Sequence, residues 1–227
     1  MFTNLVTYHI CQGADLPPYD ALAYQYLIGG NGVFIRTNCR FFSAVVPVIH
    51  HTIRGLALLK PQFRLHVPRI PVSLLESILS DARLASSSND DQPLHETLYH
   101  FYHLGHAVQV KKRPQKATAV RVQAEGDGGA DVICDLHSHG GMPPFWSPID
   151  NKDEQGARLY GVIGRVDAIR PEMKLRVGVY GYWRPLPLTA VFTANGPFKD
   201  LYQEKDDDKQ RLSQRPCGQR RLHWLHL

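Results

Sequence analysis

The chain has few of the residues that build disulfide-rich or membrane-spanning proteins. Its four cysteines, scattered through 227 residues without any Cys-x-x-Cys pair, argue against a disulfide framework and against a zinc ion closed by four thiolates. No apolar run approaches the roughly 20 residues that a membrane-spanning helix needs, and the mean hydropathy is negative. We therefore expect a soluble protein of the reducing cytoplasm that has no contact with a membrane.

Two motifs of other enzyme classes are also missing. Gly29-Gly30-Asn31-Gly32 is not followed by Gly-Lys-Ser/Thr, so it predicts a hairpin turn and not a phosphate-binding loop. His95 and His100 flank a glutamate at a spacing of five, whereas the zincin helix requires a spacing of four. We expect these two histidines, with His103 and His106, to be partly buried or surface side chains.

Charge alone specifies no partner. The net charge is +5 and the isoelectric point is near 9.0, which could attract an acidic protein or a nucleic acid. Residues 199–211 mix both charge signs and residues 215–221 are basic, but no recognised nucleic-acid motif surrounds them. A solvated tail is favoured over nucleic-acid binding.

One stretch, residues 137–150, combines two imidazoles, a hydroxyl and a carboxylate. His137 and His139 are two positions apart, so in an extended segment both side chains point the same way. The apolar, β-branched run 130–136 before them predicts a strand, and Gly140-Gly141 predicts the loop that ends it. With Asp150 as an anionic third ligand, the pattern predicts a catalytic zinc with one position left for water.

Ser147-Pro148-Ile149-Asp150 is at the same time a good helix start. Ser147 is a suitable N-cap, Pro148 suits the first helical position, and Asp150 stands where a capping box places an acid. The metal-ligand and capping interpretations are compatible.

The stretch resembles the JAMM signature of JAB/MPN-domain metalloproteases, which is His-x-His, seven residues, then Ser-x-x-Asp, with a glutamate upstream. The resemblance implies that His137, His139 and Asp150 bind zinc and that Ser147 stabilises the oxyanion. It also implies a glutamate that acts as general base on a zinc-bound water, whose pKa is lowered to about 7.

Three upstream glutamates are candidates for that base: Glu76, Glu96 and Glu125. Family members open with a helix, a loop and a Pro-x-x-Glu that begins the first core strand. Pro93-Leu94-His95-Glu96 fits this order, with an amphipathic helix predicted over 70–79 and a strand starting at Glu96. Glu76 is expected on the polar face of the helix and Glu125 in a turn, so we predict that Glu96 is the base.

The expected fold class is α+β, with a JAB/MPN-type mixed β-sheet flanked by helices. A β-rich N-terminal module is predicted over residues 1–66, the JAB/MPN-like metalloprotease domain over 67–195 and a charged C-terminal tail over 196–227. The predicted strands cover residues 4–10, 24–28, 33–36, 41–49, 106–112, 118–124, 132–136, 159–164 and 175–183. A second helix is predicted from Ser147 to about residue 156.

The order of a β-rich module and a JAB domain resembles the PRTRC system protein A family, a bacterial family of mobile-element cassettes. This implies a peptidase or isopeptidase that acts on a ubiquitin-like modifier or its conjugates, with ThiF/E1-like and E2-like cassette proteins as further partners. Two other functions remain open. One is a non-catalytic JAB/MPN scaffold, and the other is a DNA-associated accessory protein of a replicon.

Overall fold

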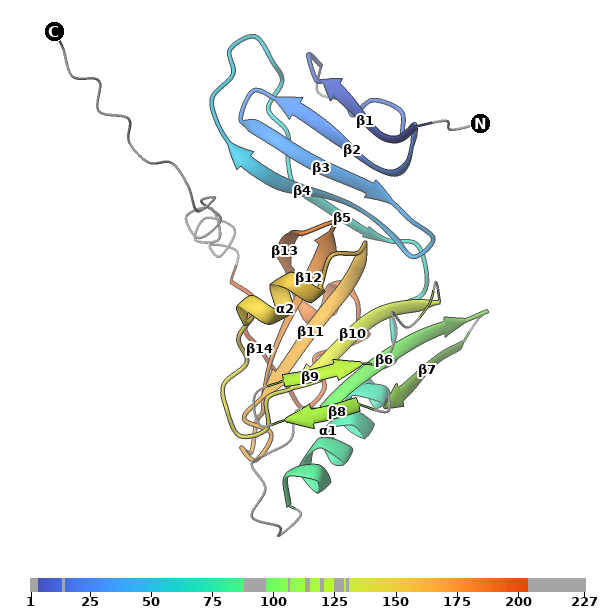
Figure 1. The fold of residues 1–227 in the computed structure, drawn as a ribbon, viewed down its shortest axis with the longest axis vertical. Helices are drawn as coiled ribbons and strands as arrows, with labels where there is room; N and C mark the ends of the chain where they lie inside the picture. Colours follow the sequence, from blue (N-terminus) through green and yellow to red (C-terminus); the bar gives the residue numbers. More distant parts are fainter. Residues whose placement is uncertain are drawn as a thin grey trace, which may run out of the picture.

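The computed structural model has two large β-sheets that follow one another along the long axis of the molecule, and one small two-stranded sheet (Figure 1). It describes residues 4–13, 15–87, 97–105, 107–112, 115–118, 121–124, 129 and 131–203. Glu96, Glu125, His95, His106 and the tail from residue 204 lie outside the described residues.

The first sheet has five strands in sequential order. They are β1 (Asn4–Ile10), β2 (Ala21–Gly29), β3 (Gly32–Asn38), β4 (Phe42–His50) and β5 (Gln62–Leu65). β1 pairs with β2 in parallel and the other pairs are antiparallel. The β2–β3 hairpin confirms the predicted turn. Gly32 is essential there, because its φ is 135° and a Cβ would lie 2.0 Å from the carbonyl oxygen of Ile49.

The second sheet is mixed, with the order β13-β12-β11-β10-β6-β7 and β14 beside β12. Its strands are β6 (Thr97–Leu104), β7 (Ala107–Lys112), β10 (Val132–Ser138), β11 (Arg158–Gly164), β12 (Glu172–Val179), β13 (Tyr182–Leu186) and β14 (Lys199–Asp200). β10 and β11 are parallel, as are β12 and β14. β8 (Gln115–Thr118) and β9 (Arg121–Ala124) form a separate two-stranded sheet.

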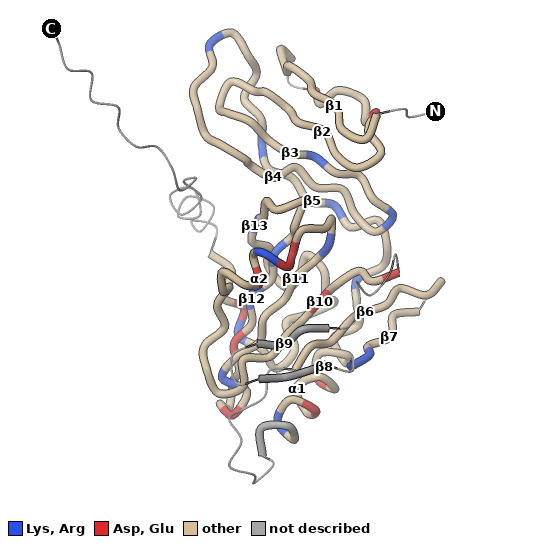
Figure 2. The backbone as a smooth tube through the Cα atoms, in the orientation of Figure 1, with Lys and Arg blue, Asp and Glu red and all other residues tan. Residues whose placement is uncertain are grey.

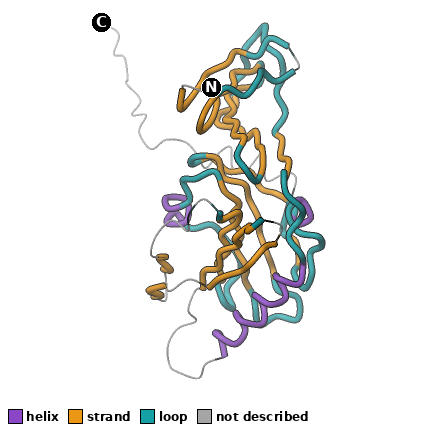
Figure 3. Tube along the Cα trace, turned by 90° about the vertical axis from the view of Figure 1, so that its right-hand side faces the viewer, coloured by secondary structure: helices purple, strands orange, loops and turns teal. Residues whose placement is uncertain are grey.

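Helices α1 (Val72–Ser87) and α2 (Pro148–Asp153) lie on opposite sides of the second sheet (Figure 3). α1 is amphipathic: Leu75 and Ile78 are buried in the core, whereas Glu76 is exposed, as predicted. A short 3-10 helix covers Leu188–Ala190. Within the described part of the chain, no helix combines the length and the apolar character needed to cross a bilayer.

Both sheets contribute to one hydrophobic core. Phe42 and Val46 of β4 belong to the same buried cluster as Leu136, Leu175 and Val177 of the second sheet. The first sheet is therefore packed against the second and is not merely tethered to it. The structure contains several β-sheets and few helices, and its N-terminal part is a β-sheet. This confirms the predicted α+β class with a β-rich N-terminal module.

Several predicted elements have different bounds. The helix expected over 70–79 is α1, which runs from Val72 to Ser87. The strand expected over 118–124 is split between β8 and β9. The strand expected over 175–183 is a hairpin, because Tyr180 and Gly181 both adopt positive φ, 47° and 85°, and turn the chain back. The helix from Ser147 ends at Asp153, after which Glu154 closes it with an N–H bond to the Asp150 carbonyl.

Basic residues are spread over the molecule. In Figure 2, Lys and Arg positions lie on several strands and loops of the first sheet, and the second sheet carries both basic and acidic positions.

Candidate metal centre

β10 carries His137 on the face of the second sheet that is turned away from α1. Leu136 and Ser138 are 0% and 2% exposed and point into the core, so His137 between them points to the other face, toward α2. His139 follows the strand directly, and its N–H donates to the Ile163 carbonyl, 2.9 Å away, at the end of β11. The predicted strand end and loop are confirmed.

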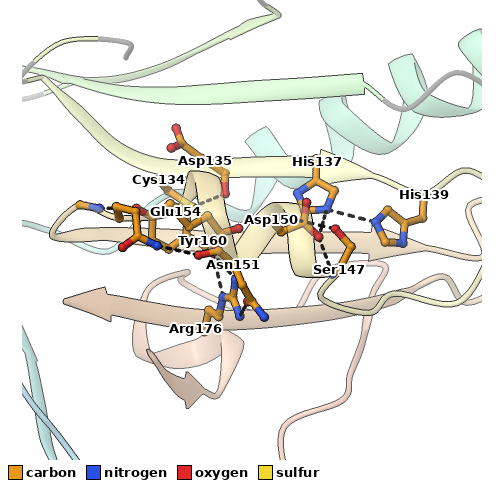
Figure 4. Close-up of polar contacts among 12 residues, drawn as sticks. Cys134, Asp135, His137, His139, Ser147, Asp150, Asn151, Glu154, Tyr160 and Arg176 are labelled. Atoms are coloured by element: carbon orange, nitrogen blue, oxygen red, sulfur yellow. Dashed lines mark hydrogen bonds and ion pairs between the residues drawn. The ribbon is translucent and has the colours of Figure 1, made fainter. Parts of the chain in front are cut away.

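α2 brings in the carboxylate through its own capping box. The Ser147 Oγ accepts a hydrogen bond from the Asp150 N–H at 3.1 Å, and the Ser147 N–H donates to Asp150 Oδ2 at 2.6 Å. Pro148 occupies the first turn. The predicted helix start is confirmed, and the cap also fixes the orientation of the Asp150 side chain (Figure 4).

The three predicted ligands converge. The His137 and His139 Nε2 atoms are 3.1 Å apart, and Asp150 Oδ2 is 3.8 Å from His137 Nε2. One ligand atom from each of the three residues lies within 4.8 Å of the others. Ligands at about 2.0–2.1 Å from a tetrahedral zinc are themselves roughly 3.3 Å apart. The donor set fits such an ion, and the separations of 3.1 Å and 3.8 Å lie close to that spacing.

The loop after β10 sets the tautomer of His139. Its Nδ1 lies 3.4 Å from the Pro143 carbonyl oxygen. With the proton on Nδ1 donated to that oxygen, Nε2 keeps its lone pair toward His137 and Asp150. A backbone carbonyl commonly orients a metal-binding imidazole in this way.

Burial keeps both imidazoles neutral. It lowers the pKa of His137 to about 4, with smaller lowering effects of His139 and Arg176, while the Asp150 charge raises it. Burial also lowers the pKa of His139, against the Pro143 carbonyl and Asp150. Both side chains are therefore unprotonated near neutral pH, which is the form that binds a metal.

Aromatic side chains flank the two histidines. The Phe145 ring is 4.5 Å from the His139 ring, and the Trp146 ring is 6.1 Å from that of His137. Met142 and Phe145 are 44% and 46% exposed. The loop therefore shields the imidazoles while it leaves an apolar surface beside the site.

The same loop is held against the end of β11. The Val166 N–H donates to the Gly140 carbonyl at 3.0 Å, and the Arg165 N–H donates to the Met142 carbonyl at 2.8 Å. Gly164 permits this approach, because a Cβ there would lie 2.3 Å from the Met142 oxygen and 2.6 Å from the Pro144 nitrogen. Backbone atoms cannot yield as a flexible side chain does.

Gly164→Ala is therefore expected to displace the loop that carries His139. We expect zinc affinity to fall about 10-fold to 100-fold, as for loss of a supporting partner, and stability to fall by roughly 1–3 kcal/mol through overpacking. Zinc competition titration and thermal unfolding measure the two effects. Gly13→Ala is the control, since nothing lies within 4 Å of its added Cβ. Wild-type zinc affinity in Gly164→Ala would contradict this role of the glycine.

The second histidine cluster does not form a site among the described residues. His100 Nε2 lies 3.7 Å from Asp135 Oδ1, and the His103 ring packs 5.7 Å from that of Phe41. Both histidines are buried, at 2% and 6% exposure, more deeply than the sequence predicted. In the part of the chain that the structure describes, one group of side chains that could hold a metal ion converges, namely His137, His139 and Asp150.

Sequence reasoning missed a second set of residues beside the site, which consists of Arg176, Glu154, Asn151 and Trp146. Arg176 donates to Glu154 and to Asn151, and its guanidinium lies over the Trp146 ring. One signal was available: Arg176 is a single charge inside the apolar run 175–179 of β12. A charge in a buried strand needs a partner.

Comparison with known families supports this part of the fold. Residues 82–177 match the family described as prokaryotic homologs of the JAB domain. The matched segment is less than half of the chain, runs from α1 to β12 and includes the three converging residues. No curated protein matches the chain.

Proposed function

We propose that this JAB-type domain is a zinc-dependent peptidase or isopeptidase. The main support for this proposal is that two neutral imidazoles and one carboxylate converge, with their ligand atoms within 4.8 Å of one another. All three lie inside the segment that matches the JAB family. His137, His139 and Asp150 would hold the zinc ion. When bound, zinc would lower the pKa of a water to about 7 and polarise the substrate carbonyl.

Glu96 is the proposed general base. It immediately precedes Thr97, the first residue of β6, and Thr97 pairs with Ser138 between the two histidines. The described part of β6 therefore starts beside the end of β10 that carries the site. The Glu96 carboxylate would take the proton of the attacking water and then give it to the leaving amine.

Ser147 is the proposed hydrogen-bond donor to the developing oxyanion. Its Oγ already accepts the Asp150 N–H, so the serine is held in one orientation by the helix cap. A preorganised donor of this kind stabilises charge as it develops on the carbonyl oxygen.

Ser147→Ala is expected to lower kcat by about 10²-fold to 10³-fold while the protein keeps its zinc. The metal is retained because the backbone N–H of residue 147, which bonds Asp150 Oδ2, survives the substitution. Loss of the cap should cost about 1 kcal/mol of stability. Ser80→Ala, at an exposed serine of α1, is the control for kcat and metal content. A near-normal kcat would exclude Ser147 as the oxyanion donor.

The proposed substrate is the C-terminus of a ubiquitin-like modifier, as a precursor tail or as a conjugate. This rests on the resemblance to the PRTRC system protein A family, which also suggests ThiF/E1-like and E2-like partners. The exposed apolar surface of Met142 and Phe145 next to the ligands suits uncharged residues beside the scissile bond.

A cleavage assay tests the function. The zinc-loaded chain should hydrolyse a ubiquitin-like protein of a PRTRC cassette that carries a C-terminal extension. A chelator should stop the reaction and added zinc should restore it. A folded chain that binds no zinc and cleaves no substrate would favour a non-catalytic scaffold. Salt-dependent DNA binding that persists in Asp150→Ala would favour a DNA-associated accessory protein.

A further inference from the structure

α2 carries one of the three candidate ligands but has little to hold it in place. It has six residues, and none of them is buried. A helix this short is not stable by itself in water, and without a buried apolar face it gains little from packing. The position of Asp150 therefore depends on specific side-chain contacts.

Arg176 of β12 supplies such contacts from beneath the helix (Figure 4). Its Nε donates to Glu154 Oε2 at 2.9 Å, its Nη2 donates to the same oxygen, and its Nη1 donates to Asn151 Oδ1 at 2.8 Å. Asn151 lies in α2 and Glu154 is its C-cap. One guanidinium thus contacts the helix directly after Asp150 and again at its end.

The same guanidinium also contacts the segment before the helix. Its central carbon lies 3.7 Å from the centroid of the Trp146 ring and 4.7 Å from that of Trp183. Trp146 directly precedes the N-cap Ser147, and its ring packs at 6.1 Å from the His137 ring. Arg176 therefore contacts the chain on both sides of Asp150. It also contacts Trp146, whose ring packs beside His137.

We propose that Arg176 is a positioning residue, which holds α2 and with it the Asp150 carboxylate beside His137. This inference rests on the proposed function.

The chemistry of the contact favours orientation over simple stabilisation. Arg176 is 2% exposed and the Glu154 side chain 11%. Burial lowers the pKa of Arg176, whereas the charge of Glu154 raises it. Burial raises the pKa of Glu154, whereas the charge of Arg176 lowers it. A buried ion pair gives little net stability compared with an apolar contact, but the planar fork of arginine fixes the direction of its partners.

Arg176→Lys tests the proposal, because lysine keeps the charge and loses the fork. We expect the zinc dissociation constant to rise about 10-fold to 100-fold, measured by competition with a chelator. The zinc-induced rise in Tm should shrink accordingly, since it depends on the ratio of zinc concentration to dissociation constant. Glu154→Gln and Asn151→Ala change the acceptors of Arg176 and leave the arginine in place. Their zinc dissociation constants test the proposal if Arg176→Lys does not fold.

Arg36→Lys is the matched control. Arg36 of β3 donates to the Pro17 carbonyl at 2.7 Å and lies 5.6 Å from the Tyr19 ring centroid, and both partners stand between β1 and β2. This variant is expected to lower Tm without changing zinc affinity. Folded Arg176→Lys, Glu154→Gln and Asn151→Ala proteins with the wild-type zinc dissociation constant would overturn the positioning role. A wild-type chain that binds no zinc would instead overturn the proposed function and this inference with it.

Discussion

Replacement of His137 or Asp150 by alanine is expected to remove bound zinc and hydrolysis together. Each substitution deletes one of the three ligand atoms that lie within 4.8 Å of one another. Loss of an outer-shell partner costs about 10-fold to 100-fold in metal affinity, so loss of a ligand should cost more. Without the metal, the lowering of the water pKa to about 7 that zinc would supply is lost.

The two substitutions should differ in their effect on folding. Asp150→Ala also removes the acceptor for the Ser147 N–H, so its melting temperature should fall further than that of His137→Ala. Zinc per chain by mass spectrometry and the rate of peptide hydrolysis are the two measurements. His51→Ala, at an exposed histidine, is the control. Hydrolysis that survives in metal-free His137→Ala would mean that zinc is not required.

Glu96→Gln is expected to separate metal binding from turnover. Glutamine has nearly the same shape but cannot accept a proton, so hydrolysis should fall by about 10²-fold to 10⁴-fold. The zinc content should remain that of the wild type, because His137, His139 and Asp150 are unchanged. Zinc analysis and kcat on the same preparation make the comparison.

Glu76→Gln provides the matched control for this substitution. Glu76 is exposed on α1, and the same change of charge there should leave both zinc content and kcat at wild-type values. If Glu96→Gln keeps full activity, the base is another group. If it loses zinc as well as activity, Glu96 acts in metal binding and not only in proton transfer.

The parts of the site that could be predicted depend on local geometry. Two histidines at alternate positions share one face in any strand, and Ser147 and Asp150 cap any helix that begins between them. Both facts follow from fewer than twenty consecutive residues. The structure adds that the two local units meet, with Asp150 Oδ2 at 3.8 Å from His137 Nε2.

The parts that could not be predicted depend on contacts between distant segments. Arg176 is 22 residues from Glu154 in sequence, and only the pairing of β12 beside β11 places it under α2. The close approach of Gly164 to the Met142 oxygen likewise requires the parallel pairing of β10 and β11. Periodicity carries no information about these pairings.

Turn chemistry explains the error over residues 175–183. The run is apolar and aromatic, which predicts a continuous strand. Tyr180 nevertheless adopts a φ of 47°, which a bulky residue rarely does, and its ring packs at 4.7 Å from that of Tyr24 in the first sheet. This contact with the other sheet is a tertiary interaction that no local pattern contains.

Metal analysis of the purified wild-type chain, together with X-ray absorption at the zinc edge, tests the metal site most directly. The expected result is about one zinc ion per chain, coordinated by nitrogen and oxygen at about 2.0–2.2 Å and by no sulfur. A chain that remains free of zinc after incubation with the metal, or a zinc coordinated by cysteine sulfur, would contradict a centre formed by His137, His139 and Asp150.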